Sequence, residues 1–376
     1  MVSQLSAGLA DASHTKSRGY VGRIPVRNLW LLMLYASELF RMQGTSQVRI
    51  EDRPDDLPDV IAEILVRAVE ERVRRRLASG YRWRNAVVSR VRGRIDVLET
   101  ERRQWLARGL VACRFEELTI DVPRNRYVRA ALETISRLVR NPDIERRCRT
   151  AANCLKVLGV SGHSPTPTEI KRSYSGRNER DDQFMVAAAH LVFELAIPTE
   201  ESGTNTLSMP NRDEFWMRQL FERAIGGFYD VVLRPRGWRV HRGGTLRWNI
   251  DQQTAGIKAI LPTMRTDIVL DNPLSSRRIV IDTKFTSILT RGWYKEESLR
   301  SGYLYQIYAY LHSQVGRGEW LADNAEGLLL HPSIGQTIDE TVVIQAHRIR
   351  FATVDLTAPT AAIRQRLLVF CEDTFV

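Results

Sequence analysis

Apolar residues recur every three or four positions along several long stretches of the chain, a spacing typical of amphipathic helices. The stretch "IPVRNLWLLMLYASELF" (24–40) predicts an extended entry followed by a largely buried helix from about Asn28. Residues 57–79 predict a second helix that becomes basic toward its end near Gly80. Further helices are expected at 125–140, 143–159, 181–197, 213–233, 299–315 and 358–371.

Alternation of apolar and polar residues marks the expected strands. Residues 81–100 alternate around a glycine at a bend, which predicts strands or a β-hairpin bearing Arg90, Arg92 and Arg94. Because strands and helices are interleaved, we expect a mixed α/β (α+β) protein. Other strands are expected at 238–248, 264–270, 277–285, 326–332 and 342–351.

A break rich in Gly, Ser and Pro, at residues 159–169, separates two parts of the chain. The whole chain has 376 residues, 43% of them apolar, which is enough for two hydrophobic cores. We therefore expect a polar leader at 1–20, an N-terminal domain at 21–165 and a C-terminal domain at 166–376.

The sequence argues against several classes of protein. No apolar run approaches the roughly 18 residues of a membrane span, and the start lacks a signal-peptide layout, so we expect a cytoplasmic protein. Cysteines at 113, 148, 154 and 371 show no CxxC spacing, which predicts reduced, mostly buried thiols and no zinc site. The sequence also lacks a glycine-rich P-loop, so no nucleotide is expected to bind this chain.

The positive charge is concentrated in the first part of the chain. Residues 1–160 hold 30 Lys and Arg against 19 Asp and Glu, whereas residues 161–376 hold 25 of each. Such a basic domain suits a phosphate backbone or an acidic protein surface, although its Arg-rich helices are equally compatible with ordinary solvated faces. Only six of the 55 basic residues are lysines, and one of them is Lys284.

An apolar strand at 277–285, "RRIVIDTKF", carries two charges in its middle. Alternation places Asp282 and Lys284 on one face together with Val280. Burying an unpaired charge costs roughly several kcal/mol unless it finds a partner or a metal. A structural ion pair and a functional site both satisfy this requirement.

A second acidic residue arrives on the preceding strand. In "MRTDIVLDNPLSSRRIVIDTKF" an Asp-Asn-Pro turn brings Asp267 back toward Asp282 and Lys284. Two neighbouring carboxylates repel each other unless a cation lies between them, and Mg²⁺ prefers such oxygen ligands. The carbonyl of Thr283 is a candidate third ligand. Two acids, a metal and an ammonium group are the components of a phosphodiester hydrolase.

The pattern Asp267 and Asp282-Thr283-Lys284 resembles the core of PD-(D/E)xK nucleases, with Thr266 in place of the usual proline. The resemblance extends to the McrC family, the nuclease subunits of McrBC modification-dependent restriction systems. Seven segments occur in the order found in that family, namely "IPVRNLWLLMLYASELF", "VRGRIDVLET", "CRFEELTIDVPRNRYVRAAL", "LPTMRTDIVL", "IVIDTKF", "LYQIYAYL" and "EGLLLHP", which together span roughly residues 24–332.

The resemblance implies a fold, a set of partners and a catalytic site. The N-terminal part would be a mixed α/β domain, with a hairpin or small barrel, that docks on a hexameric McrB-like AAA+ GTPase. The C-terminal part would be a restriction-endonuclease-like domain with a mixed sheet flanked by helices, which cuts modified double-stranded DNA. Dimerisation through this domain is left open. Asp267, Asp282 and Lys284 take the catalytic positions, with Mg²⁺, or alternatively Mn²⁺, as cofactor.

Supporting residues are less specific. Gln306 and Tyr310 share a helical face where related nucleases place a supporting glutamine and tyrosine, although Tyr310 is equally suited to packing on the sheet. Glu222 is either a further acid near the metal or an ordinary exposed helical glutamate. Arg90, Arg92 and Arg94 are candidates for contacts with the motor or with DNA, and Arg23 and Arg27 for contacts with the motor. For each of them, an ordinary surface or interface salt bridge is the alternative.

We therefore expect a Mg²⁺-dependent endonuclease subunit that acts with, and stimulates, an AAA+ GTPase in antiviral restriction. The alternative is a non-catalytic adaptor that activates the AAA+ ring and keeps the nuclease fold as a scaffold. The sequence leaves open which base modification is recognised, whether the motor uses GTP or ATP, which N-terminal residues stimulate it, and the oligomeric state of the isolated chain.

Overall fold

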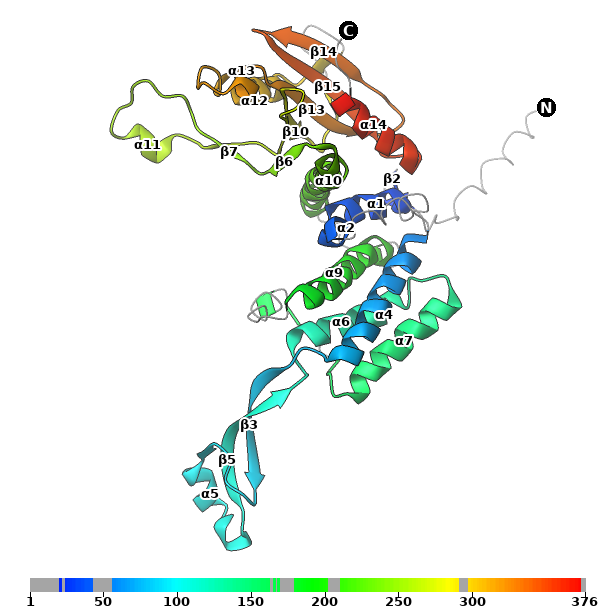
Figure 1. Ribbon diagram of the computed structural model, residues 1–376, viewed down its shortest axis with the longest axis vertical. Coiled ribbons are helices and arrows are strands. Elements are labelled where there is room, and N and C mark those ends of the chain that lie inside the picture. Colours follow the sequence, from blue (N-terminus) through cyan, green and yellow to red (C-terminus); the bar gives the residue numbers. More distant parts are fainter. Residues whose placement is uncertain are drawn as a thin grey trace, which may run out of the picture. The chain divides into compact units, whose positions relative to one another are not determined.

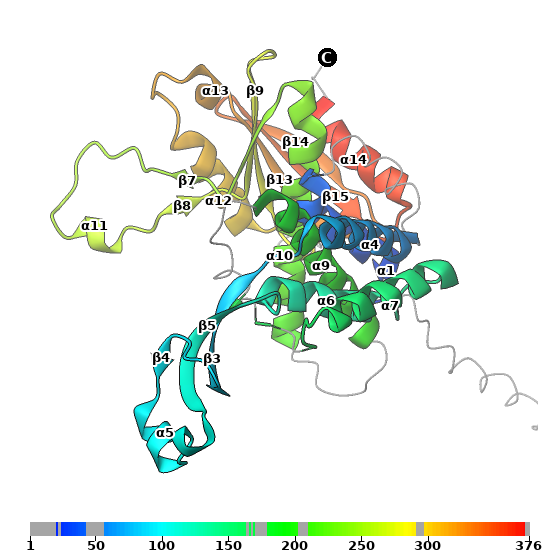
Figure 2. The same cartoon turned by 60° about the horizontal axis from the view of Figure 1, so that its bottom comes forward.

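A computed structural model describes residues 20–21, 24–42, 56–162, 165–166, 168–169, 179–201, 210–290 and 297–372. The chain forms two compact units. The first unit comprises residues 1–57 and 197–376, and the second comprises residues 58–196. Among the described helices, none combines the length and apolar character needed to cross a bilayer. Figures 1 and 2 show the elements of both units.

The first unit is built on a six-stranded mixed sheet whose strand order is β14-β15-β13-β10-β9-β6. The three central strands, β10, β13 and β15, are parallel, and antiparallel strands complete both sides. The sheet therefore has the mixed architecture expected from the sequence. The strands are β6 (Arg239–Arg242), β9 (Ile268–Asn272), β10 (Arg277–Thr283), β13 (Glu326–Ser333), β14 (Asp339–Ile344) and β15 (His347–Asp355).

Helix α12 (Ser301–His312) covers one face of this sheet. Its Ile307, Tyr310 and Leu311 join a buried apolar cluster with residues of the sheet that include Val280 and Leu329. A glycine at 327 permits this close approach, because a β-carbon there would meet the Ile307 side chain at 2.9 Å. The apolar side chains of α12 thus lie on the same strand face as Val280, which by alternation is the face of Asp282.

Helix α10 (Pro210–Leu233) and helix α1 (Val26–Ala36) of the first unit pack with their backbones almost in contact. A β-carbon at Gly227 would lie 1.9 Å from the Tyr35 carbonyl oxygen. The buried Asn28 side chain donates hydrogen bonds to the carbonyl groups of Leu356 and Ala358, at 2.7 and 3.0 Å. Residues 24–42, which include β2 (Ile24–Pro25) and α2 (Glu38–Met42), are therefore part of the first unit.

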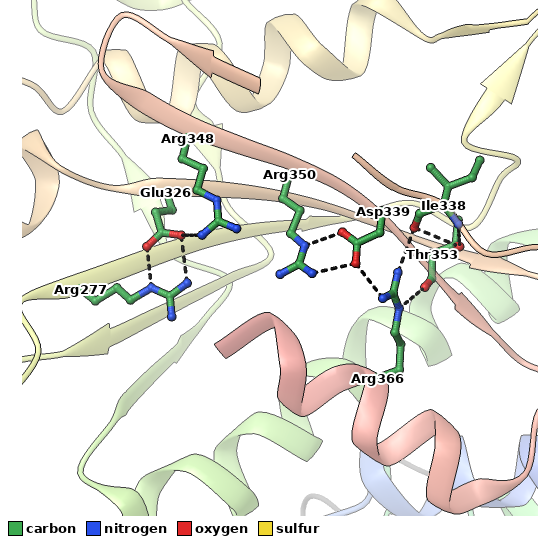
Figure 3. A network of polar contacts seen from close by, with 8 residues as sticks. All are labelled: Arg277, Glu326, Ile338, Asp339, Arg348, Arg350, Thr353 and Arg366. Atoms are coloured by element: carbon green, nitrogen blue, oxygen red, sulfur yellow. Dashed lines mark hydrogen bonds and ion pairs between the residues drawn. The ribbon is translucent and has the colours of Figure 1, made fainter. Parts of the chain in front are cut away.

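Arginine–carboxylate pairs tie the strands to helix α14 (Thr360–Glu372), as Figure 3 shows. Asp339 accepts from Arg350 at 2.6 and 2.7 Å and from Arg366 at 2.7 Å. Burial acts to raise the pKa of Asp339, but the hydrogen bonds and charges of these two arginines outweigh it and lower the pKa. In the same network Arg277 bridges to Glu326 and donates to the Cys371 carbonyl at 2.7 Å.

The second unit combines a helical bundle with a three-stranded sheet. Buried Asp182 pairs with Arg72 at 2.7 Å and with Arg124 at 2.9 Å, which ties α9 to α4 and α6. Its helices are α4 (Leu57–Arg75), α5 (Val97–Arg102), α6 (Pro123–Ile135), α7 (Pro142–Val157) and most of α9 (Glu179–Glu201). The sheet order is β3-β5-β4, from β3 (Gly80–Val88), β4 (Arg94–Ile95) and β5 (Val111–Thr119).

The structure corrects two local expectations. Residues 81–100 contain strands, as in the first alternative, but these do not form a hairpin with each other, because β3 and β4 both pair with β5, a strand at 111–119 that was not expected. The single strand expected at 342–351 is two strands. They are joined by a turn in which Gln345 and Ala346 adopt positive φ angles of 48° and 69°.

The compact units divide the chain differently from the expected domains. Residue 165, the expected end of the N-terminal domain, precedes α9, which the Asp182 ion pairs and the Tyr127–Phe193 ring contact at 4.8 Å hold in the second unit. Conversely, residues 24–42 pack with the first unit through the α1–α10 contact. Of the four thiols, Cys113, Cys148 and Cys371 are buried, and Cys154 is exposed.

We predict that Gly227→Ala destabilises the first unit. The added methyl group overlaps the Tyr35 carbonyl, so α1 and α10 must separate, at a cost of about 3 kcal/mol or more. Gly256→Ala is the matched control, because no atom lies within 4 Å of the place that its added methyl group would occupy, and it should change stability by no more than about 1 kcal/mol. Urea unfolding of both variants measures the difference, and equal stabilities would contradict the α1–α10 packing.

Candidate active site

The register of two antiparallel strands brings the predicted acids together. Strands β9 and β10 pair Ile268 with Ile281, and each acid is the next residue beyond that pair. Asp267 therefore stands opposite Asp282 at the end of the paired segment. Strand β8 (Met264–Arg265) precedes Asp267, whereas Asp282 lies within β10.

Asp267 is fixed by the backbone beside Asp282. Its Oδ2 atom accepts a hydrogen bond from the Thr283 amide at 2.7 Å and another from the Thr283 hydroxyl at 2.8 Å. The Asp267 carbonyl accepts from the Gly243 amide at 2.8 Å. The carboxylate thus has one fixed orientation, because both the amide and the hydroxyl of Thr283 donate to it. The Thr283 carbonyl stays a predicted metal ligand.

Asp282 and Lys284 form a buried ion pair. Lys284 Nζ lies 2.7 Å from Asp282 Oδ2, and Lys284 and Asp282 are only 6% and 0% exposed. Burial raises the pKa of Asp282 to about 6; the charge of Lys284 opposes this shift, and the charge of Asp267 reinforces it. The Lys284 amide donates to the Leu330 carbonyl at 3.0 Å, which keeps residue 284 aligned with β13.

The oxygen atoms of this pair fit a hard divalent cation. In the part of the chain that the structure describes, Oδ1 of the buried Asp282 has no hydrogen-bond partner. Oδ1 also lacks an ion-pair contact of the kind that Lys284 makes with Oδ2. Such an oxygen is costly to bury unless it binds a cation. The described residues contain no group of three His, Cys, Asp or Glu side chains arranged to hold a metal.

Two of the three supporting residues belong to helix α12. Gln306 Nε2 donates to the Tyr310 hydroxyl at 2.5 Å. Burial raises the pKa of Tyr310, the Gln306 hydrogen bond opposes this, and the charges of Asp282 and Asp267 add to the rise. Tyr310 also belongs to the apolar cluster under the sheet. Tyr310 therefore packs on the sheet and also lies close enough to the two acids for their charges to affect its pKa.

Glu222 on α10 is half-buried, and the charge of Asp267 affects its pKa. Burial raises its pKa, and Asp267 raises it further, whereas the cations Arg218, Arg265 and Lys284 oppose the rise. Glu222 thus stands in the electrostatic environment of the site, and the description of an ordinary exposed glutamate does not fit it.

Tyr303 and His331 are two further neighbours of Lys284 that sequence reasoning did not assign to the site. Lys284 Nζ lies 5.3 Å from the centre of the Tyr303 ring, whose centre lies 5.8 Å from that of His331. Burial lowers the pKa of His331 to about 4, so its neutral ring donates from Nδ1 to the Thr286 carbonyl at 2.9 Å. A lone aromatic residue and a lone histidine carry no sequence signal, because only the fold brings them beside the lysine.

The arginines expected to contact a partner or DNA lie in the second unit. Arg90, Arg92 and Arg94 are exposed. The Arg92 guanidinium lies 5.6 Å from the centre of the Phe115 ring. Arg94 of β4 stands opposite Arg114 of β5 in the antiparallel strand register. Arg27, which belongs to the first unit, is also exposed, whereas Arg23 falls outside the described residues.

Comparison with known proteins places the chain in a family. Residues 9–322 match the family described as "McrBC 5-methylcytosine restriction system component". Among solved structures, one similar chain comes from a half-complex of the tetradecameric assembly of Thermococcus gammatolerans McrB AAA+ hexamers with bound McrC. The likeness covers 92% of this chain and 76% of that one, at 15% sequence identity and a TM-score of 0.40. Curated proteins give no match.

The family match covers most of the chain and agrees with the resemblance carried by the seven ordered segments. It includes both the basic N-terminal part and the strands that bear Asp267, Asp282 and Lys284. The chain belongs to the McrBC family of 5-methylcytosine restriction system components.

Proposed function

We propose that this chain is the nuclease subunit of a McrBC-type restriction system and hydrolyses phosphodiester bonds of modified DNA. The observation that carries the proposal is the juxtaposition of Asp267 and Asp282 across β9 and β10, with Lys284 paired to Asp282. Membership of a restriction-system family supports the substrate class.

Asp282 and Asp267 are the proposed ligands of Mg²⁺, with Mn²⁺ as an alternative. The bound ion supplies a Lewis acid for the phosphoryl group and makes water a better nucleophile at neutral pH. Asp282 offers its Oδ1 atom, which has no hydrogen bond within the described residues, whereas the Thr283 amide and hydroxyl orient Asp267. Lys284 places a positive charge where a phosphate gains negative charge in the transition state, and the Tyr303 ring stands against its ammonium group.

The proposed partner is a McrB-like hexameric AAA+ GTPase that drives cleavage of DNA. A component of a restriction system acts with other components, and this chain carries no P-loop in its sequence. The solved half-complex contains McrC bound to McrB AAA+ hexamers, and we extend that association to this chain as part of the proposal. The exposed Arg90, Arg92 and Arg94 of the basic N-terminal part are the proposed docking residues.

We predict that Asp282→Ala or Lys284→Ala lowers DNA cleavage by about 100-fold or more, because each change removes a group that stabilises charge in the reaction. Both variants should still bind the motor and stimulate its GTPase. Cleavage of methylated and unmethylated DNA by the copurified complex, with GTP and Mg²⁺, provides the measurement.

Lys156→Ala serves as the matched control, since Lys156 is an exposed lysine of α7 in the second unit, and it should cleave like the wild type. Unchanged cutting by Asp282→Ala would remove this site from the mechanism. A wild-type complex that stimulates the GTPase but never nicks modified DNA would establish the adaptor function instead.

The buried Asp282 also predicts a pH dependence of stability in the metal-free protein. Its pKa is about 6 in the folded chain, whereas the ordinary pKa of an aspartate in an unfolded chain is 3.8, so the folded state binds the proton more tightly. Ionisation of the buried Asp282 therefore lowers the free energy of unfolding. This loss is absent below pH 3.8, grows as the pH rises, and is complete above pH 6. Its full size is about 3 kcal/mol.

Urea unfolding in EDTA at acidic and neutral pH provides this measurement. The Asp282→Asn variant cannot ionise at this position, so it serves as the reference. Between about pH 4 and pH 7, the free energy of unfolding of the wild type should fall by about 2 kcal/mol relative to that of the variant. Added Mg²⁺ at neutral pH should stabilise the wild type more than the variant. A pH-independent difference would show that Asp282 titrates normally.

A further inference from the structure

One uninterrupted ladder connects Asp267 to a projecting segment of the first unit. Strand β6 pairs with β9, and strand β7 (Thr245–Leu246) pairs with β8 in the same register. Between them, the Gly243 amide donates to the Asp267 carbonyl at 2.8 Å, and the Thr266 amide donates to the Gly244 carbonyl at 2.9 Å. Because the register does not shift, the ribbon beyond Asp267 is aligned with the catalytic strand.

This ribbon carries residues 247–263, here called the arm, which extend away from the six-stranded sheet in both views (Figures 1 and 2). The base of the arm is fixed. Trp248 Nε1 donates to the Pro262 carbonyl at 2.7 Å, which closes the loop. Arg317 Nη2 and Gln314 Nε2 donate to the Arg247 carbonyl at 2.6 and 3.2 Å, which anchors it to residues that follow α12.

The outer part of the arm, in contrast, is exposed to solvent. Every residue from 249 to 263 is exposed except Ile257 and Leu261, which are half-buried. The short helix α11 (Ile257–Ile260) presents Lys258 and an Ile260 side chain that is 77% exposed. Ile250 is 46% exposed. An arm held at its base, with apolar side chains in water, has the character of a surface that binds a partner.

The charge of the arm favours one kind of partner. Arg247 and Lys258 lie within the arm, Arg265 follows it, and Asp251 is the sole acid between residues 243 and 266 of the sequence. Lys258 is one of six lysines in the whole chain. The net charge is positive, and the arm leads directly to an acid that is proposed to act on a phosphodiester. A polyanion is therefore the complementary partner.

We propose that the arm binds duplex DNA beside the scissile phosphodiester, an inference that rests on the proposed nuclease function. Two-stranded ribbons fit the major groove, and exposed aliphatic side chains contact base and sugar edges in either groove. Lys258 and Arg247 contact phosphates, and Ile260 enters the groove. The unbroken register then fixes the distance from these contacts to Asp267, which positions the cleaved phosphate relative to the bound segment.

DNA binding by the full chain in the Asp282→Asn background tests the arm without cleavage. The probe is a fluorescent duplex of about three helical turns, followed by anisotropy at several salt concentrations. Replacing residues 250–260 with Asn-Gly keeps the base of the arm and should weaken binding at least tenfold. Lys258→Ala should reduce the slope of log affinity against log salt by about 0.9, because one phosphate contact is lost. Lys156→Ala, the matched exposed lysine, should bind like the parent.

Urea unfolding confirms that the shortened variant folds, since the arm contributes little to the core. Unchanged affinity in that variant, or no binding by the parent, would overturn the proposal. Sedimentation velocity adds a second outcome: if removing the arm converts dimers to monomers while DNA affinity is unchanged, the arm joins two copies and the DNA assignment is wrong. If the proposed nuclease function is wrong, the result is different: the wild type binds DNA through the arm but does not cut it.

Discussion

The rest of the first unit depends on one constraint, the burial of a carboxylate inside a sheet. Asp282 is fully buried, and its partner Lys284 is nearly so. Desolvation of two such groups costs roughly several kcal/mol, and the single Lys284 contact at 2.7 Å offsets this incompletely because Oδ1 of Asp282 has no hydrogen bond within the described residues. If this ion pair served stability alone, apolar residues of similar size would serve better. The raised pKa of Asp282 is instead consistent with a site that keeps a carboxylate oxygen available for another ligand.

The surrounding structure keeps this costly arrangement from relaxing. On one face, Ile307 and Tyr310 of α12 pack against Val280 and Leu329, directly below the acids along the strands. At the opposite end of β10, Arg277 is bound by Glu326 and by the last turn of α14. Strand β10 is thus held by apolar packing, by neighbouring strands on both sides and by ion pairs. Asp282 cannot move toward water without disturbing all three.

The candidate catalytic residues could be predicted from the sequence because they violate the local pattern. An aspartate and a lysine inside "RRIVIDTKF" contradict an apolar strand, and such contradictions mark functional positions. Elements governed by distant contacts could not be predicted. The apolar–polar alternation of β5 breaks at Glu116 and Glu117, two polar residues in succession, and the place of α9 is set by Asp182 meeting Arg72 and Arg124 more than fifty residues earlier. The turn at Gln345 and Ala346 lacks the usual glycine or asparagine.

The hairpin of β6 and β9 joins chemistry and recognition in one covalent element. Asp267 stands midway along a ladder whose inner half is the sheet and whose outer half is the arm. Gly243, opposite Asp267, adopts a φ of 68°, and a β-carbon there would meet Arg265 Nη2 at 2.8 Å. Glycine thus allows Arg265, one of the cations that oppose the raised pKa of Glu222, to lie across the ribbon beside the acids. A duplex bound along the arm would therefore meet Lys258, Arg247 and Arg265 before it reaches the carboxylates, where a bound cation is needed to offset their repulsion of its phosphate.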